Sequence, residues 1–528
     1  MVNRRSRGYK RKVTASTAQR LILRGGRSAA LGFLIRFGAR LLFVFVAGRL
    51  FGAALFGAYA VAVAVVELAV TVGGAGLKRQ IFKLLDEEEG GRSPPHILID
   101  SGLLVAAASL ACIAPVMLAM ALLPGTMVAD NTEAALLLLA PMILGQALLD
   151  LVLAATRWTH RMRYQVWARS VIEPYAGVAA AILAWAAGWS QAGLILGYWA
   201  GTLAALAYAL AGARRCLGPF RLGQYRFAPA RIAHIVRQTA LPTLSDFTNA
   251  LAGRLDLYLV GLFLGEAPAG IYGMAQQLRT PIRQVRQSFD GLLTPIVSRT
   301  LKHGGAAQTG RATASASRLI LAIELPFLVA LAVLGAPLLR AIGPEFVAGY
   351  WAMLLLAAAE SIQGAFGVSD LIFLYRRPQM VIVITLVSAS VNLVAGWLLI
   401  AAYGVTGGAL AALLAVAAAA IARRALLRAL FAVAVPLRYV AAPLSAAGAD
   451  LGIALIVLAL PLEDHALRLG LAAAFGLAAY GAVLKGALWA TGQSLSLSHF
   501  VVEDPKAAAP GQSSQMDPVP ISLPPGPA

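Results

Sequence analysis

Residues 52–59 read GAALFGAY, and residues 265–272 read GEAPAGIY. In both stretches a Gly is followed five positions later by a second Gly and two positions after that by a Tyr, and the two stretches lie 213 positions apart. Each stretch begins near the point where one apolar block gives way to the next. A motif that recurs at matching places indicates that two parts of the chain are built on one plan.

The composition places the chain in a lipid bilayer. The 528 residues are 59% hydrophobic and only 13% charged, with a mean hydropathy of +0.75. Soluble globular domains carry about a quarter charged residues. The apolar residues also form blocks of roughly 20, the length that a helix needs to cross a hydrocarbon core. We therefore expect an all-α polytopic membrane protein.

Fourteen blocks have the length and composition of membrane-spanning helices. They are 28–50, 55–77, 97–123, 134–156, 170–188, 193–213, 239–264, 269–299, 317–340, 347–373, 380–402, 404–428, 441–460 and 467–489. The block 269–299 is long, and we expect it to bend at Pro281, because proline interrupts the helical hydrogen-bond ladder.

The distribution of Lys and Arg predicts the orientation in the membrane. Basic residues concentrate in every second connection, whereas only Arg49, Arg340 and Arg468 fall on the other side. The rule predicts that both termini lie in the cytoplasm. It also accounts for the net charge of +20, because basic cytoplasmic segments contact anionic lipid headgroups. We expect membrane lipids, and no nucleic acid, as partners of these segments.

Several kinds of site are not expected. Cys112 falls inside a block and Cys216 in a loop, so a disulfide is not predicted. The six His residues are scattered singly, which argues against a metal site. The chain has no G-x-x-x-x-G-K-[ST] phosphate loop. No cofactor is expected.

The position of the repeat predicts two lobes. One copy joins the first and second blocks and the other joins the seventh and eighth, so both face the same side of the membrane, as in parallel-repeat transporters. The glycines would allow a tight bend and close helix contact, and the tyrosines would lie in the interfacial belt. The expected parts are a basic N-terminus (1–27), an N-lobe of six helices (28–213), a cytoplasmic linker (214–238), a C-lobe of six helices (239–430), two further helices (431–493) and a disordered tail (494–528).

Two longer stretches resemble a known family. RLFGAALFGAYAVAVAV (49–65) and GRLDLYLVGLFLGEAPAGIYGMAQQL (253–278), with Pro295 beyond the second, are similar to the polysaccharide and O-antigen flippases. These belong to the multidrug, oligosaccharidyl-lipid and polysaccharide exporter superfamily. The resemblance covers about residues 28–430 and implies two six-helix lobes around a central cavity that opens alternately to the two sides. It implies transport of a lipid-linked oligosaccharide for lipopolysaccharide or exopolysaccharide biosynthesis, with a polysaccharide polymerase as a candidate protein partner.

Charged residues inside the predicted spans are the functional candidates, because charge in a bilayer is costly. Guanidinium forks bind phosphate oxygens in pairs, which suits the pyrophosphate of a polyprenyl-pyrophosphate-linked oligosaccharide. The candidate pyrophosphate-binding residues are Arg36, Arg40, Arg254, Arg279, Arg283 and Arg286. The run of Arg279, Arg283, Arg286 and Asp290 forms one stripe on a helix. In the alternative interpretation, its three arginines lie close to the cytoplasmic surface and anchor lipid headgroups, and Arg254 pairs with an acid on a neighbouring helix.

Intramembrane acids are candidates for ion coupling. A carboxylate held away from water takes up and releases protons readily, and a carboxylate also binds Na⁺, so either H⁺ or Na⁺ would drive an antiporter cycle. The candidates are Glu67, Asp246, Asp256, Glu324 and Glu360. Alternatively, each acid is a fixed counter-ion to one of the arginines.

Three other functions stay open at the level of sequence. A peptidoglycan-precursor flippase would also need to bind a pyrophosphate. A multidrug or cation antiporter would favour an acid-lined cavity, whereas arginine dominates the charged candidates here. A membrane polysaccharide polymerase or ligase would need a large extracytoplasmic loop, and every predicted outside connection is short. We therefore expect a transporter and no enzyme.

Overall fold

The computed structural model describes residues 35–86, 94–122, 130–159, 161–218, 229–289, 293, 305–461 and 463–492. Within these ranges the secondary structure is helical, without a β-strand. The predicted basic N-terminus (1–27) and disordered tail (494–528) lie outside the described residues, as do Asp290 and Pro295.

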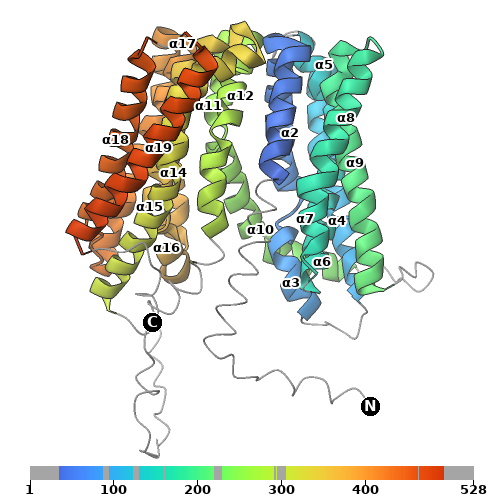
Figure 1. Cartoon of the computed structure of the whole chain (residues 1–528). Helices are drawn as coiled ribbons and strands as arrows, with labels where there is room; N and C mark the ends of the chain where they lie inside the picture. Colours follow the sequence, from blue (N-terminus) through green and yellow to red (C-terminus); the bar gives the residue numbers. More distant parts are fainter. Residues whose placement is uncertain are drawn as a thin grey trace, which may run out of the picture.

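The N-terminal half of the chain forms one bundle (Figure 1, blue to green). Its first helical segment, 35–46, continues directly into η1. The helices that follow are η1 (Ala47–Phe51), α2 (Gly52–Gly73), α3 (Leu77–Asp86), α4 (Pro94–Leu122), α5 (Asp130–Leu139), α6 (Met142–Trp158), α7 (Arg163–Trp167), η3 (Ala168–Ile172), α8 (Glu173–Ala186) and α9 (Ser190–Leu217). Helix α2 packs against α4, α5 and α6, and α9 packs against α6 and α8.

The C-terminal half forms a second bundle beside the first (Figure 1, light green to red). Its helices are α10 (Pro229–Ala252), α11 (Leu255–Leu264), α12 (Glu266–Leu278), a segment at 280–289, α14 (Ala306–Ile342), η5 (Pro344–Gly349), α15 (Tyr350–Gly367), α16 (Asp370–Arg376), α17 (Gln379–Phe431), α18 (Arg438–Ala459) and α19 (His465–Ala490). Helices α11 and α15 pack on α17, while α18 and α19 pack on each other and on α14.

Eight helices of the described residues are long and apolar enough to cross a membrane, or ten if two bent pairs each count as one span. Helix α17 is in fact two antiparallel helices, because Gly404 breaks it with φ +56° and the Ser388 hydroxyl donates to the Ala415 carbonyl at 3.2 Å. In a straight helix these residues would lie ~40 Å apart. Every predicted block overlaps a helix, and the total of fourteen spans stays a prediction.

Both copies of the repeated motif begin a helix after the same kind of turn. Gly52 has φ +72° and ψ 178°, and Gly265 has φ +85° and ψ −167°. This left-handed region is open to glycine and strained for other residues. After the first turn the chain reverses, since the rings of Phe43 and Tyr59 lie 6.2 Å apart. The predicted helical corners are therefore present.

The second glycine of each copy contacts the helix that carries the other copy. A Cβ at Gly57 would lie 1.8 Å from the Glu266 carbonyl oxygen, and a Cβ at Gly270 would lie 1.9 Å from that of Ala53. Helices α2 and α12 thus cross with their backbones in contact, which only very small residues permit. The contact is reciprocal, as in an interface between two copies of one surface.

The tyrosines of the repeat are not interfacial, so that prediction is wrong. Tyr272 is fully buried and donates to Asp256 Oδ2 at 2.5 Å, and Tyr59 is half-buried between the two halves. The crossing of α2 and α12 encloses both motifs, so their side chains face protein. The helix of the long block 269–299 is interrupted near Pro281: α12 ends at Leu278 and helical structure resumes at 280–289. The proline lacks the N–H that the hydrogen-bond ladder requires, and the bend itself stays a prediction.

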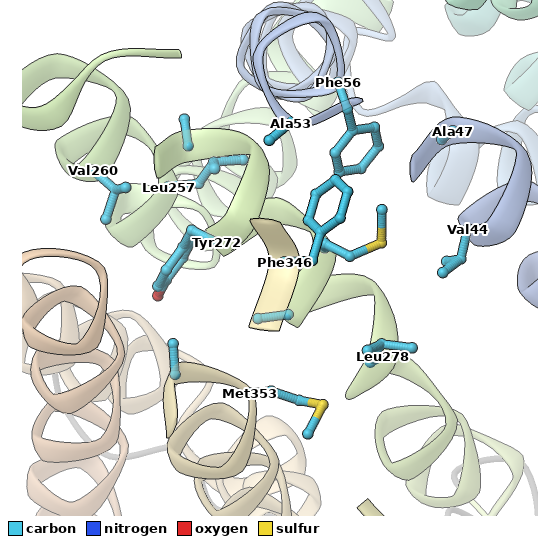
Figure 2. Packing of buried hydrophobic residues seen from close by; sticks show 14 of the residues in the cluster. Val44, Ala47, Ala53, Phe56, Leu257, Val260, Tyr272, Leu278, Phe346 and Met353 are labelled. Atoms are coloured by element: carbon cyan, nitrogen blue, oxygen red, sulfur yellow. The ribbon is translucent and has the colours of Figure 1, made fainter. Parts of the chain in front are cut away.

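The largest hydrophobic cluster joins the two halves. Figure 2 shows side chains from both halves converging there, including Phe56 of α2, Tyr272 of α12, Phe346 of η5 and Met353 of α15. All four of these side chains are fully buried. The cluster lies beside the Gly52 and Gly265 turns, at what we call the glycine-turn end of the molecule. The two halves are therefore packed firmly together at that end.

Candidate functional site

A cavity of about 360 Å³ lies between the two halves and is called the central cavity here. The first hairpin contributes Arg36, Arg40 and Glu67, and the turn between α10 and α11 contributes Arg254. The remaining charged side chains of the lining are Arg169 and Glu173. Four arginines thus face two glutamates, so the lining carries a positive balance suited to an anion.

Arg36 and Arg40 lie one helical turn apart and both line the central cavity. Arg36 Nε donates to Ser170 Oγ at 3.3 Å, and Arg40 Nη2 donates to Thr280 Oγ1 of the other half at 3.0 Å. Among the described residues, the buried Nε of Arg40 has no acceptor. A buried guanidinium N–H without an acceptor favours a bound anion. The predicted sharing of one helical face is confirmed.

Arg254 forms an ion pair with Glu67 across the cavity. Glu67 belongs to α2 of the N-terminal half, while Arg254 precedes α11 of the C-terminal half. The Tyr258 hydroxyl strengthens the same junction by donating to the Ala64 carbonyl at 2.7 Å. The interpretation that Arg254 pairs with an acid on a neighbouring helix is confirmed, and the pair is still accessible from the cavity.

Arg169 was missed at the level of sequence, since it lies one residue before the predicted block 170–188. It sits on the π-helical segment η3 and forms ion pairs with Glu173 at 2.8 Å and with Asp150. Its Nη1 also donates to Gln146 Oε1 at 3.0 Å. The four-residue spacing of Arg169 and Glu173 is a signal that identifies such a pair on one helical face.

The other three candidate arginines do not line the central cavity. Arg279 Nη1 and Arg283 Nε lie 3.5 and 3.6 Å from the Glu360 carboxylate of α15, and Arg279 is buried. Arg286, on the segment 280–289, lies close to Gly367 at the end of α15. These side chains face α15, so their role in pyrophosphate binding stays a prediction.

The candidate acids fall into different environments. Glu67, Asp246 and Glu360 each pair with an arginine, as a counter-ion would. Asp256 is buried and accepts from Tyr272 and from Gln276. Glu324 of α14 is fully buried and packs on Gly364, and neither of its oxygens has a donor in the part of the chain that the structure describes. Ion coupling stays a prediction for all five.

No group of three or more His, Cys, Asp and Glu side chains within the described ranges is placed to hold a metal ion. Cys112 and Cys216 are both free thiols. The expectations of no metal and no cofactor stay predictions.

The sequence profile of a family described as "Polysaccharide biosynthesis protein" matches residues 22–301, more than half of the chain. The chain belongs to this family. No curated protein gives a significant match. The predicted resemblance to polysaccharide flippases and their superfamily is confirmed at the level of family and fold.

Two solved structures show which fold the family member adopts. The lipid II flippase MurJ in an inward closed conformation aligns with a TM-score of 0.71 at 14% identity, covering 88% of this chain and all (100%) of that chain. An inward-facing multidrug resistance MATE family transporter of the MOP superfamily aligns with a TM-score of 0.57 at 12% identity, covering 76% and 98%. The chain is therefore a multi-pass membrane protein with the MurJ and MATE transporter fold.

Proposed function

We propose that this protein is a flippase that moves a polyprenyl-pyrophosphate-linked oligosaccharide from the cytoplasmic to the periplasmic leaflet of the bacterial inner membrane, for cell-surface polysaccharide biosynthesis. Membership of the polysaccharide biosynthesis family supports the pathway. The observation that carries the proposal is the cavity between the two halves, lined by Arg36, Arg40, Arg169 and Arg254.

The lining suits a pyrophosphate for two reasons. Guanidinium groups bind phosphate oxygens in a fork geometry and stay charged when buried. They also come from both halves, so one anion would contact both, replacing Glu67 on Arg254. Gln276, Gln277 and Gln284 add neutral donors and acceptors to the lining, which would suit sugar hydroxyls.

Alternating access would use the contacts between the halves. At the glycine-turn end, Glu266 of α12 accepts from Thr132 N and Oγ1 at 2.8 and 2.9 Å and from Asn131 Nδ2 at 2.8 Å, both in the first turn of α5. With both termini in the cytoplasm, this end faces the periplasm. The structure would then be a state closed to the periplasm, and release would require these contacts to break.

A peptidoglycan-precursor flippase is the second candidate function. The likeness to MurJ extends over the full length of that chain, and a lipid-linked precursor of this kind also carries a pyrophosphate. A multidrug or cation antiporter fits less well, because four arginines in the cavity would repel a cation. Coupling to H⁺ or Na⁺ through the candidate acids, and a polymerase partner, belong to the proposal as further steps.

The test uses cells that lack the protein and measures which leaflet holds the complete lipid-linked oligosaccharides. We expect accumulation on the cytoplasmic side, rescue by the wild type and by Arg340→Ala, and no rescue by Arg36→Ala combined with Arg40→Ala. Arg340 is an exposed arginine outside the central cavity and controls for loss of an arginine elsewhere. If complete units reach the periplasmic leaflet without the protein and only their polymerisation fails, the protein is no flippase.

A further inference from the structure

A second cavity, of about 650 Å³, lies at the end of the molecule opposite the glycine turns. Its lining residues come from the C-terminal end of α2, from the turn after it, from α3 and α6, and from α10 of the other half. Three basic side chains line it, Lys78 and Arg79 of α3 and Arg157 of α6. We call it the basic cavity.

The basic side chains are held by acids that an anion would replace. Lys78 Nζ lies 3.1 Å from Asp150 Oδ2, and Arg79 Nη2 lies 2.6 Å from Asp246 Oδ1. The Lys78 and Arg79 side chains remain 55% and 61% exposed, so they are accessible to a ligand. The guanidinium of Arg157 stacks over the Phe82 ring, and its buried Nε has no acceptor among the described residues.

A chain of alternating charges joins the basic cavity to the central cavity. Asp150 lines the basic cavity, where it pairs with Lys78, and it also pairs with Arg169. Arg169 lines the central cavity beside its second partner, Glu173. An anion that displaces Asp150 from Lys78 would therefore disturb a side chain of the central cavity directly.

Helices α2 and α10 are in contact near the basic cavity. An apolar groove of about 430 Å³ lies beside this contact, lined by the end of α2, by α4 and by α10. Its lining includes Leu104, Val236, Leu244 and Phe247. The 74–76 turn lines both spaces, with Gly74 and Gly76 in the basic cavity and Ala75 in the groove. The turn lies close against α10, since a Cβ at Gly76 would lie 2.9 Å from Thr243 Oγ1, a residue that lines the groove. The adjacent Ala75 has φ +47°, a conformation that costs a non-glycine residue about 1 kcal/mol.

We propose that the basic cavity is an entry site for the pyrophosphate of the lipid-linked cargo, with the first isoprene units in the apolar groove. This inference rests on the proposed flippase function and adds a site to it. Seating both parts of the lipid requires the 74–76 turn to move away from α10. Binding of the pyrophosphate to Arg79 releases Asp246 and so removes the ion pair that ties α3 to α10.

The experiment measures binding of a radiolabelled polyprenyl diphosphate to the purified full-length protein in nanodiscs. An Arg36→Ala, Arg40→Ala background reduces the contribution of the central cavity, and every variant is compared within that background. Arg79→Gln and Lys78→Gln are each expected to weaken binding by ~10-fold, the effect of one lost charge-assisted contact. Asp246→Asn is expected to strengthen it, because Arg79 loses its competitor. Lys83→Gln, on α3 but outside the lining, is the matched control and leaves affinity unchanged.

Weaker binding in Arg79→Gln together with tighter binding in Asp246→Asn would establish the site. Equal losses in both would show that the ion pair is only a structural tie and would overturn the inference. Phosphatidylglycerol in the nanodisc is titrated as a competitor of the radiolabelled polyprenyl diphosphate. If it competes as strongly as unlabelled polyprenyl diphosphate does, the site binds bulk anionic lipid instead of the cargo. Unchanged binding in all these variants, with flipping still lost in Arg36→Ala, Arg40→Ala cells, would reject the entry site and leave the proposed function standing.

Discussion

Arg254 and Glu67 come from different halves of the chain and meet in the central cavity. Their side chains are 35% and 44% exposed, so the ion pair is worth far less than a buried one and stays exchangeable. A pyrophosphate offers Arg254 more oxygens than one carboxylate does. We therefore expect Glu67 to pair with Arg254 only in the absence of ligand, and the pyrophosphate to replace the Glu67 carboxylate when it binds.

This exchange predicts unequal effects for the two residues. Arg254→Gln should lower the affinity for a pyrophosphate-bearing lipid by ~10-fold, because a charge-assisted contact is lost. Glu67→Gln should keep or raise that affinity, because Arg254 is then unopposed. The measurement is the apparent KM for lipid translocation in proteoliposomes. Equal losses for both variants would mean that the ion pair acts only as a link between the halves.

At the scale of elements, the crossing of α2 and α12 depends on two glycines. The backbones touch where Gly57 and Gly270 face each other, so a single added methyl group has no free space. Neighbouring backbone carbonyls form the contact, and these move only if the whole helix moves. The motif that repeats in the sequence is thus the surface on which the halves meet.

Gly270→Ala should therefore destabilise the protein, by ~1–3 kcal/mol, the usual cost of overpacking a tight contact. Gly102→Ala is a matched control, because this helical glycine has nothing within 4 Å of an added Cβ. The control should be neutral or slightly stabilising, since Ala is the better helix former. Thermal unfolding in detergent compares the two, and an unaffected Gly270→Ala would show that the helices are not in contact.

At the scale of the whole molecule, the halves are joined at the glycine-turn end by a hydrophobic cluster and by the hydrogen bonds of Glu266. At the opposite end they are joined through α10, including the exposed Arg79–Asp246 ion pair. Apolar packing between large side chains is costly to separate, whereas an exposed ion pair is worth only ~1 kcal/mol or less. The end opposite the glycine turns should open more easily in the state described.

Alternating access predicts that a covalent link at the glycine-turn end stops transport. In a variant with Asn131→Cys and Glu266→Cys, and with Cys112→Ala and Cys216→Ala, a short cleavable thiol-reactive crosslinker would join the two introduced cysteines. Translocation in proteoliposomes should fall to background after linking and recover after cleavage. Each single-cysteine variant, treated with the same reagent, should stay active. Full activity of the linked protein would exclude a cycle in which this end opens.

The class of the protein and the plan of its two halves could be predicted from the amino-acid sequence. Apolar blocks of about 20 residues indicate membrane-spanning helices, because a helix hydrogen-bonds all the backbone N–H and C=O groups that the bilayer core cannot. The glycines at 52 and 265 mark the turns because few other residues adopt their φ values. Arg36 and Arg40 were predictable as a pair, since residues four apart share one helical face.

Which charged side chains pair with each other depends on how the helices pack, and this could not be predicted from the sequence. The packing joined Arg254 to Glu67, residues 187 positions apart, and placed Arg279 and Arg283 beside Glu360 of α15. Arg169, which lies one residue before a predicted span, lines the central cavity in the folded protein. Helical periodicity specifies the face on which a side chain lies, but the neighbour of that face depends on how the helices pack. The burial of the motif tyrosines has the same cause, because the two copies of the repeat face each other.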